Sequence, residues 1–381
     1  MTAKITVPET VLNGSFEDKR DYFYEKTLKH PKQVECFEQA QRAIANPHGN
    51  RVVMIVGPTG AGKSKLVSRL EQFLLDEFNL SRHGPAALPY LSIEAMSVVR
   101  DNFDWSIYFS QLLHDANELL IDQKKLSPAG SHEVDLPESI KRLPKTASSL
   151  CMAFINCVRA RQPAVVITDE AQGIAKVTNS RRMLDQIDLV KSVANLTQVL
   201  QILVGTYDLL ALHNLSGQLG RRIKLIHFER YKPDCKQDRE VFRSIVYSLQ
   251  QHLPLPTVPN LSGWLDLMLE GSQGCVGILK EWLLEALQMA LYQDAPTLTN
   301  AVLEEAAYSG QTLGQIKKEI SEGERRLELG VDDIDLSSLF SGKTPKRKTL
   351  PDSKERPKRR GSKRPGTRNP VRDKVGVSDD G

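Results

Sequence analysis

Residues 57–64 read Gly-Pro-Thr-Gly-Ala-Gly-Lys-Ser, which fits the pattern G-x-x-x-x-G-K-[ST] of a phosphate-binding loop. A continuous apolar run, 52–56, comes directly before this loop, and a helical pattern follows it to about residue 78. The glycines let backbone N–H groups curl around phosphate oxygens, and the start of the helix adds the positive end of its dipole. The residues expected to contact the nucleotide are Gly57, Pro58, Thr59, Gly60, Ala61, Gly62, Lys63 and Ser64.

Specific roles follow for the end of this loop and for an acidic pair further along the chain. Lys63 is expected to reach the β- and γ-phosphates, and Ser64 to hold a magnesium ion. Residues 164–170 are an apolar strand pattern that ends in two carboxylates. We expect Asp169 to hold the magnesium through water and Glu170 to polarise the attacking water. ATP and Mg²⁺ are therefore the expected cofactors.

Two further candidate positions follow the next strand pattern. Thr206 comes after Leu-Val-Gly, where its hydroxyl can orient the lytic water, and the alternative is a threonine in an ordinary turn. Arg221 and Arg222 close the α/β part of the chain. Paired arginines are usually surface residues. Here we expect at least one of them to reach the γ-phosphate held by a neighbouring subunit.

The order of the elements predicts the fold class and the domains. Strand patterns alternate with helical patterns, which favours an α/β fold with a parallel sheet, and the strands are expected at 52–56, 88–93, 164–168, 199–204 and 223–228. Helices are expected at 30–45, 105–120, 146–160, 181–199, 239–252, 261–270 and 277–292, with a loop or insertion at 122–145. The domains are expected to be an N-terminal arm (1–29), an α/β nucleotide-binding domain (30–233), an α-helical lid (234–330) and a disordered basic tail (331–381).

The net charge of +4 conceals a strongly basic C-terminus. Residues 343–381 hold 14 Lys/Arg and 5 Asp/Glu, a balance of +9, which leaves 37 basic and 42 acidic groups, or −5, for the rest of the chain. This tail has no aromatic residue for base stacking. It is expected to contact nucleic-acid backbone, with a docking peptide or a merely solvated tail as the alternatives.

Composition excludes several classes of protein. Hydrophobic residues make up 40% of the chain, which is too many for disorder over most of its length. No apolar run approaches the roughly 20 residues that a membrane span needs. The five cysteines form no C-x-x-C pair or Cys/His cluster, so free thiols are expected and a structural zinc site is not. We expect a soluble cytoplasmic protein with no membrane partner.

The order of these motifs resembles that of an AAA+ ATPase. The segments are GPTGAGKS, VVITDEAQ, ILVGTYDL, QLGRR and, in the helical region, GCVGILKEW. Within that superfamily the chain is similar to the TnsC/TniB transposition regulators, relatives of MuB and IstB, and FDWSIYFSQLL also looks like that family. The resemblance covers about residues 28–310. It implies a P-loop AAA+ domain, with its parallel sheet flanked by helices, followed by a small all-α lid.

The resemblance also implies roles by matching motif. The matches are Gly57 to Ser64 with Walker A, Asp169 and Glu170 with Walker B, Thr206 with sensor 1, and Arg221 and Arg222 with the arginine-finger region. Residues 277–282 match the start of the sensor 2 helix, where many members have an arginine and this chain offers Lys280. Lys280 is therefore a nucleotide-contact candidate. Its coupling to phosphate is expected to be weaker because lysine lacks the planar guanidinium fork.

The family implies a switch rather than a metabolic enzyme. ATP-bound subunits form rings or filaments on double-stranded DNA, recruit a DDE-type transposase and come apart on hydrolysis. The implied partners are duplex DNA, further copies of the chain, the transposase and a TniQ-like targeting protein, which in some members links to a CRISPR effector. The alternatives are a replication initiator or helicase loader, which often carries a winged helix, and a STAND-type signalling ATPase, which usually carries sensor repeats.

Candidate DNA contacts follow from where such proteins line their pore. These segments come after the second strand and before the helix that precedes Walker B. They contain Arg100, Lys145 and Thr146. Groups of this kind bind phosphates without reading sequence. The alternative for each is an ordinary solvated surface residue.

Overall fold

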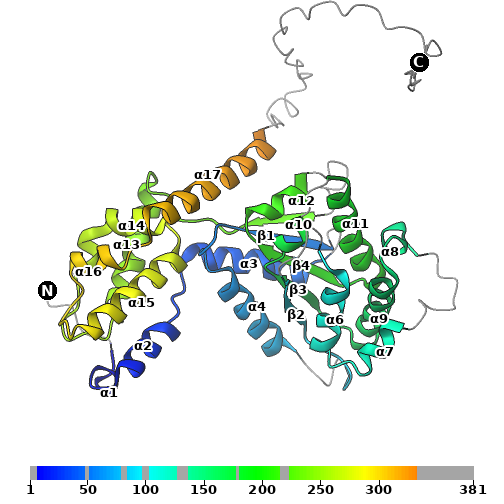
Figure 1. The fold of residues 1–381 in the computed structure, drawn as a ribbon, viewed down its shortest axis with the longest axis horizontal. Helices are drawn as coiled ribbons and strands as arrows, with labels where there is room; N and C mark the ends of the chain where they lie inside the picture. The colour runs from blue at the N-terminus through cyan, green and yellow to red at the C-terminus, as the bar shows by residue number, and fades with distance from the viewer. Residues whose placement is uncertain are drawn as a thin grey trace, which may run out of the picture. The chain divides into compact units, whose positions relative to one another are not determined.

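A computed structural model of the chain describes residues 7–47, 51–78, 84–96, 103–126, 136–176, 180–214 and 223–332 (Figure 1). All of these residues belong to one compact unit. Arg100, Arg221, Arg222 and the basic segment 343–381 lie outside the described residues. The predictions made for them therefore stay predictions.

A five-stranded parallel sheet forms the centre of the α/β part, as predicted. Its strands are β1 (Val52–Val56), β2 (Leu91–Glu94), β3 (Val165–Asp169), β4 (Leu200–Gly205) and β5 (Ile223–His227). The order across the sheet is β2-β3-β4-β1-β5, and every neighbouring pair is parallel. β1 therefore lies between β4 and β5, which explains why all five of its residues are buried.

Helices cover both faces of this sheet, and the side chains of β1 alternate between them (Figure 1). Val53 and Ile55 pack into the apolar cluster that includes residues of α3 (Pro31–Ala45) and α4 (Lys63–Glu77). Val52, Met54 and Val56 pack into the opposite cluster. Its helices are α6 (Trp105–Asp115), α9 (Lys145–Arg161) and α11 (Ser180–Thr197). Burial on both faces selects a strand without polar positions, as the sequence has at 52–56.

Several of the predicted boundaries were wrong, and two of them have a clear physical cause. The predicted helix 105–120 ends at Asp115, because Asn117 (φ 53°) and Leu120 (φ 57°) are left-handed and stop the helical path. The predicted strand 88–93 begins only at Leu91, since Pro89 has no N–H to give to a ladder.

The segment 122–145, predicted as a loop or insertion, contains short helices where it is described. These are α7 (Ile121–Leu126) and α8 (Glu138–Lys141). Short elements also follow β3 and β4, and they are α10 (Gln172–Ala175), η1 (Tyr207–Leu209) and α12 (Leu210–Asn214).

The C-terminal region is helical, as predicted. It contains α13 (Lys236–Gln250), η3 (Leu261–Trp264), α14 (Leu265–Ser272), α15 (Val276–Tyr292) and α16 (Asn300–Glu305). Its apolar core includes Phe242 and Trp282, and the Trp282 indole donates a hydrogen bond of 2.9 Å to the carbonyl of Leu303. Trp282 is thus a core residue.

The N-terminal residues join this helical core. The arm forms α1 (Glu9–Leu12) and α2 (Phe16–Glu25), and α2 contacts α15. Ser15 caps α2 by accepting the Asp18 N–H, while the Asp18 carboxylate accepts the Ser15 N–H, a capping box. Phe23 is fully buried among the side chains of the helical region.

The helix α17 (Gly310–Asp332) was not among the predicted elements. It returns from the helical region to the α/β part, where Leu327 packs on the core of the sheet. Ile320 packs with Cys275 and Ile278 near the start of α15. The spacing of Leu313, Ile316 and Ile320 is helical and would have indicated this element.

Across the described ranges, none of the helices has both the length and the apolar character that crossing a membrane requires.

Candidate functional site

The phosphate loop joins the C-terminal end of β1 to the start of α4. Gly60 (φ 73°) and Gly62 (φ 99°) have left-handed backbones, which glycine adopts without strain. A side chain on Gly57 would place its Cβ 2.5 Å from the carbonyl oxygen of Phe228, so close packing also requires glycine there. A Cβ built on Gly62 meets nothing within 4 Å, so the preference for glycine there comes from its left-handed backbone alone.

Lys63 lies in this loop with 6% of its surface exposed. Its ammonium group donates hydrogen bonds to the carbonyl oxygens of Gly57 (3.1 Å) and Pro58 (2.8 Å). Burial lowers the pKa of Lys63, while the nearby carboxylates of Glu170 and Asp169 act in the opposite direction. The lysine is thus held by the loop itself, beside the two predicted acidic residues.

The acidic pair stands at the end of β3. Asp169 is the last residue of the strand, and its carboxylate accepts the N–H of Glu170 at 2.9 Å. Glu170 has φ 50°, a left-handed conformation that is strained for a residue other than glycine. Backbone strain of this kind often accompanies functional sites because the surrounding structure must impose it.

Thr206 directly follows β4, which lies between β1 and β3 in the sheet. Parallel order therefore brings three strand ends together, and Glu170, Thr206 and the phosphate loop line one cavity of about 530 Å³. The backbone N–H of Thr206 donates a hydrogen bond of 3.2 Å to the side chain of Gln172, which also lines the cavity. Gln172 had no role in the sequence prediction.

The opposite wall of this cavity comes from the N-terminal arm, the start of α3 and the helical region. Among its residues are Tyr24, Lys26, Thr27, Leu28, His30, Gln33, Leu249, Val276, Gly277, Lys280, Glu281 and Leu284. The sequence analysis did not predict most of these residues as site residues, because they reach the cavity only when segments that are distant in sequence pack together. The His-Pro step at 30–31, which starts α3, was the available indication.

Lys280 lines the cavity, but its ammonium group is bound to the arm. It donates a 2.6 Å hydrogen bond to the carbonyl oxygen of Tyr24 and lies 5.7 Å from the centre of that ring. Burial, with a contribution from Lys65, lowers the pKa of Lys280. The predicted contact of Lys280 with nucleotide stays a prediction.

The helical region also contacts the phosphate loop directly. The N–H of Gly277, at the start of α15, donates a 2.8 Å hydrogen bond to the carbonyl oxygen of Gly60. The Thr59 hydroxyl donates to the Glu319 carboxylate of α17 at 3.1 Å. The loop is therefore hydrogen-bonded to both α15 and α17.

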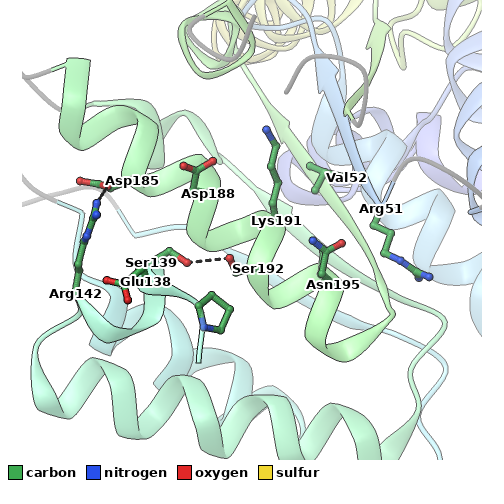
Figure 2. Close-up of a pocket in the computed structure, with 12 residues that line it drawn as sticks. Arg51, Val52, Glu138, Ser139, Arg142, Asp185, Asp188, Lys191, Ser192 and Asn195 are labelled. Carbon is green, nitrogen blue, oxygen red and sulfur yellow. Dashed lines mark hydrogen bonds and ion pairs between the residues drawn. The ribbon is translucent and has the colours of Figure 1, made fainter. Parts of the chain in front are cut away.

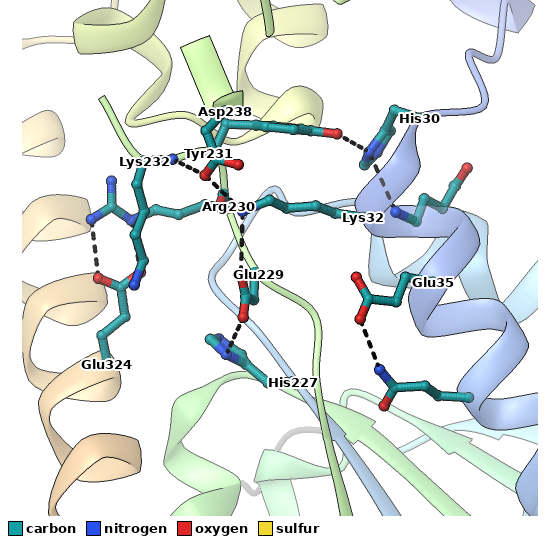
Figure 3. A network of polar contacts seen from close by, with 12 residues as sticks. His30, Lys32, Glu35, His227, Glu229, Arg230, Tyr231, Lys232, Asp238 and Glu324 are labelled. Carbon is teal, nitrogen blue, oxygen red and sulfur yellow. Dashed lines mark hydrogen bonds and ion pairs between the residues drawn. The ribbon is translucent and has the colours of Figure 1, made fainter. Parts of the chain in front are cut away.

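A polar network joins the α/β part to the helical region beside the cavity (Figure 3). The Lys32 ammonium contacts the carboxylates of Glu229 (3.2 Å) and Asp238 (2.8 Å). Arg230 and Glu324 of α17 form a largely buried two-bond ion pair at 2.9 and 3.0 Å. These bonds fasten the connection that leads from β5 to the helical region.

His30 belongs to the same network and caps α3. Its Nδ1 accepts the N–H of Gln33 at 3.4 Å and is 3.0 Å from the Tyr231 hydroxyl (Figure 3). Burial lowers the pKa of His30 to about 4, and the positive charge of Lys32 adds to this. The neutral imidazole is therefore the form that supports this contact near neutral pH.

A second cavity, of about 700 Å³, lies at the start of β1, the end of this strand that is opposite the phosphate loop. Figure 2 shows the residues that line it. Arg142 and Asp185 form an ion pair of 2.7 Å across it, and the hydroxyls of Ser139 and Ser192 are 2.8 Å apart. Its wall mixes basic and acidic side chains, and none of the predicted site residues lines it.

Lys145 and Thr146, the predicted DNA contacts that the structure describes, form the first turn of α9 and are both exposed. Neither residue lines either of these cavities. Exposure at a helix start is compatible with phosphate binding and equally with a solvated surface, so these contacts stay a prediction.

Comparison with known proteins supports the class of domain. Residues 45–212 match the family model of the AAA domain. The sequence matches none of the curated proteins with which it was compared.

Several solved structures are similar to this chain over most of its length. The ADP form of the Aeropyrum pernix ORC2 protein is 14% identical with a TM-score of 0.46, over 75% of this chain and 71% of that one. The Walker-type ATPase PABY2304 of Pyrococcus abyssi is 14% identical with a TM-score of 0.40, over 84% and 80%. Drosophila ORC bound to DNA is 12% identical with a TM-score of 0.44, over 91% and 84%. Likenesses this distant do not bear on function.

The family match and the architecture of the sheet with its phosphate loop together define the class of domain. Residues 45–212 match an AAA domain, and the parallel sheet with its phosphate loop and flanking helices is that of the AAA+ fold.

Proposed function

We propose that this chain binds ATP with Mg²⁺ in the 530 Å³ cavity and hydrolyses it. The observation that carries the proposal is the convergence of three strand ends. The phosphate loop, the acidic residue Glu170 and the polar residue Thr206 all line this one cavity, although they are far apart in sequence. That arrangement supplies phosphate binding and water activation at the same place.

The residues present fit a nucleotide with its magnesium ion. The loop residues from Thr59 to Lys65 line the cavity, and the carbonyl oxygens that bind the Lys63 ammonium are partners that a phosphate can replace. Ser64 and Asp169 are oxygen donors of the kind that Mg²⁺ prefers, with the remaining ligands coming from phosphates and water. When bound, Mg²⁺ neutralises charge on the phosphates and orients them.

The remaining side chains then have defined tasks in this proposal. Glu170 orients and polarises the attacking water, and Thr206 donates to it or to the γ-phosphate. The apolar residues Leu28, Val276 and Leu284 on the far wall provide contact area for the base. Lys280 and an arginine of a neighbouring subunit, Arg221 or Arg222, complete the charge stabilisation of the γ-phosphate.

We further propose that the output of this ATPase is assembly on double-stranded DNA, in the manner of a TnsC/TniB transposition regulator. The motif order and the charge separation between an acidic body and a basic tail support it. Arg100, Lys145 and Thr146 would contact DNA phosphates. The further partners would be copies of the chain, a DDE-type transposase and a TniQ-like targeting protein in the cytoplasm. A replication initiator is the alternative that this fold also accommodates.

Electron microscopy of the protein with duplex DNA tests the assembly. Samples with and without a slowly hydrolysed ATP analogue are compared, and the Lys63→Ala variant controls for nucleotide binding. We expect rings or filaments only when DNA and nucleotide are both present. Single subunits in every condition would contradict the assembly proposal, and a loaded replicative helicase in a pull-down would favour the initiator.

The basic tail and the two exposed α9 residues are tested by DNA affinity at several salt concentrations. Removing residues 343–381 should weaken binding at low salt and flatten its salt dependence, because fewer counterions are released. The Lys145→Ala variant should weaken binding similarly but less. Unchanged affinity at all salt concentrations would exclude the DNA role of the segment concerned.

A further inference from the structure

Gln172 bridges the ends of two neighbouring strands inside the proposed ATP site. It begins α10, three residues after the end of β3, and only 7% of its surface is exposed. Its amide nitrogen donates a hydrogen bond to the Glu170 carboxylate. Its amide oxygen accepts the N–H of Thr206, the residue after β4, at 3.2 Å. Both the nitrogen and the oxygen of the Gln172 amide are therefore hydrogen-bonded.

The backbone at Gly205 leaves space for the Gln172 carboxamide. A Cβ built on Gly205 would lie 2.4 Å from the amide oxygen of Gln172, so any side chain at position 205 would push the amide out of place. Glycine at 205 thus leaves room for the bridge at the end of β4.

Only a carboxamide of this length meets both demands at once. It offers a donor to a carboxylate and an acceptor to a backbone N–H. A glutamate keeps the acceptor, loses the donor and adds a negative charge beside Glu170. An asparagine has the right groups but is shorter by one methylene.

We propose that Gln172 is the positioning residue for Glu170 in ATP hydrolysis, and that it ties the carboxylate to the segment that starts at Thr206. This inference rests on the proposed ATPase function. The segment continues into η1, whose Tyr207 packs against Gly323 of α17. The orientation of the water-activating carboxylate therefore depends on the position of the helical region through Gln172.

The decisive measurement is single-turnover ATP hydrolysis together with nucleotide affinity. Gln172→Glu should lower the single-turnover rate at saturating ATP about tenfold or more, because positioning of the general base is lost. Nucleotide affinity should fall by less than the turnover rate, because the added negative charge repels the phosphates while the phosphate loop is untouched. Gln172→Asn should recover part of the loss. Gln288→Glu is the matched control, since Gln288 also donates to a carboxylate, Glu285, but lies on α15 away from the cavity lining.

A double-mutant cycle separates positioning from a general structural effect. If Gln172 acts through Glu170, adding Gln172→Glu to Glu170→Gln should cause no further loss of the residual turnover. A further tenfold loss would show that Gln172 acts independently of Glu170 and would overturn the proposal.

A measurement that does not depend on turnover tests the hydrogen bond between the Thr206 N–H and the Gln172 amide oxygen. Hydrogen exchange at the Thr206 amide should be faster in Gln172→Ala than in the wild type and unchanged in Gln172→Glu, which keeps the acceptor. Equal exchange in all three proteins would contradict the bridge. A wild type that binds ATP but never hydrolyses it would contradict the ATPase proposal and this role with it, whereas equal turnover of wild type and Gln172→Glu would overturn the role alone.

Discussion

Gly323 of α17 lies so close to Tyr207 that a Cβ at this position would be 2.1 Å from Cγ of the ring. The Tyr207 hydroxyl in turn forms a 2.9 Å hydrogen bond with Nε2 of His227, at the end of β5. The absence of a side chain at Gly323 therefore lets α17 pack closely against η1, the segment that follows Thr206. The adjoining Arg230–Glu324 ion pair and the Thr59–Glu319 hydrogen bond hold α17 in the same place.

Gly323→Ala should destabilise the protein. In an open helix position, alanine replacing glycine stabilises by up to about 1 kcal/mol. At position 323 the added methyl group must displace the Tyr207 ring, and overpacking of this kind costs about 1–3 kcal/mol. Gly314→Ala on the same helix is the control, since a Cβ there meets nothing within 4 Å. Chemical denaturation should rank Gly314→Ala above the wild type and Gly323→Ala below it. Equal stability of the two variants would refute the contact.

Lys63→Ala should weaken ATP binding without unfolding the protein. The variant removes a buried ammonium group whose partners are the loop carbonyls at Gly57 and Pro58. Loss of a charged hydrogen bond to phosphate corresponds to about a 10- to 100-fold weaker affinity. Titration with a fluorescent ATP analogue measures it, and Lys236→Ala, at an exposed lysine on α13, serves as the control. If Lys63→Ala bound the ATP analogue as tightly as the wild type, the proposal that this cavity binds phosphate would be contradicted.

Glu170→Gln should separate nucleotide binding from hydrolysis. The amide keeps the shape of the side chain but cannot accept a proton from water, so turnover should fall about a hundredfold or more. Nucleotide-bound assemblies on DNA should then persist. Phosphate release and the lifetime of the assemblies measure the two effects. Rapid disassembly of the variant would contradict a hydrolysis-driven switch.

Folding stability should decrease as the pH falls from neutral toward 4. Burial lowers the pKa of His30 to about 4 from its ordinary value of 6.5. Between these values the unfolded chain binds a proton that the folded chain does not, so stability rises with pH across this window. A shift of that size corresponds to about 3 kcal/mol between the two ends of the window. Burial also lowers the pKa of His227, which adds to the same trend.

The His30→Asn variant isolates the contribution of His30, because asparagine can still cap α3 and does not titrate. Urea denaturation at pH 5 and pH 7 should show a smaller difference for the variant than for the wild type. The same pH dependence in both proteins would exclude His30 as its source.

The sequence alone indicated the parts of the site that are local. The phosphate loop was recognisable because glycines at fixed spacing, an apolar strand before them and a helix after them all act within about twenty residues. The acidic pair was recognisable for a similar reason, since Asp169 and Glu170 directly end a buried strand. Alternation of strand and helix patterns was enough to predict a parallel sheet, and the observed sheet confirms it.

Only the tertiary structure decided how distant segments meet. Nothing local marks Gln172 as the partner of Thr206, Lys280 as the partner of the Tyr24 carbonyl, or Phe23 as a core residue of the helical region. The helix α17 was missed although its apolar spacing was present, because its importance depends on where it packs. Local conformation is set by neighbouring residues, whereas these contacts exist only once strand order and helix packing have brought together residues that are 34 to 256 positions apart.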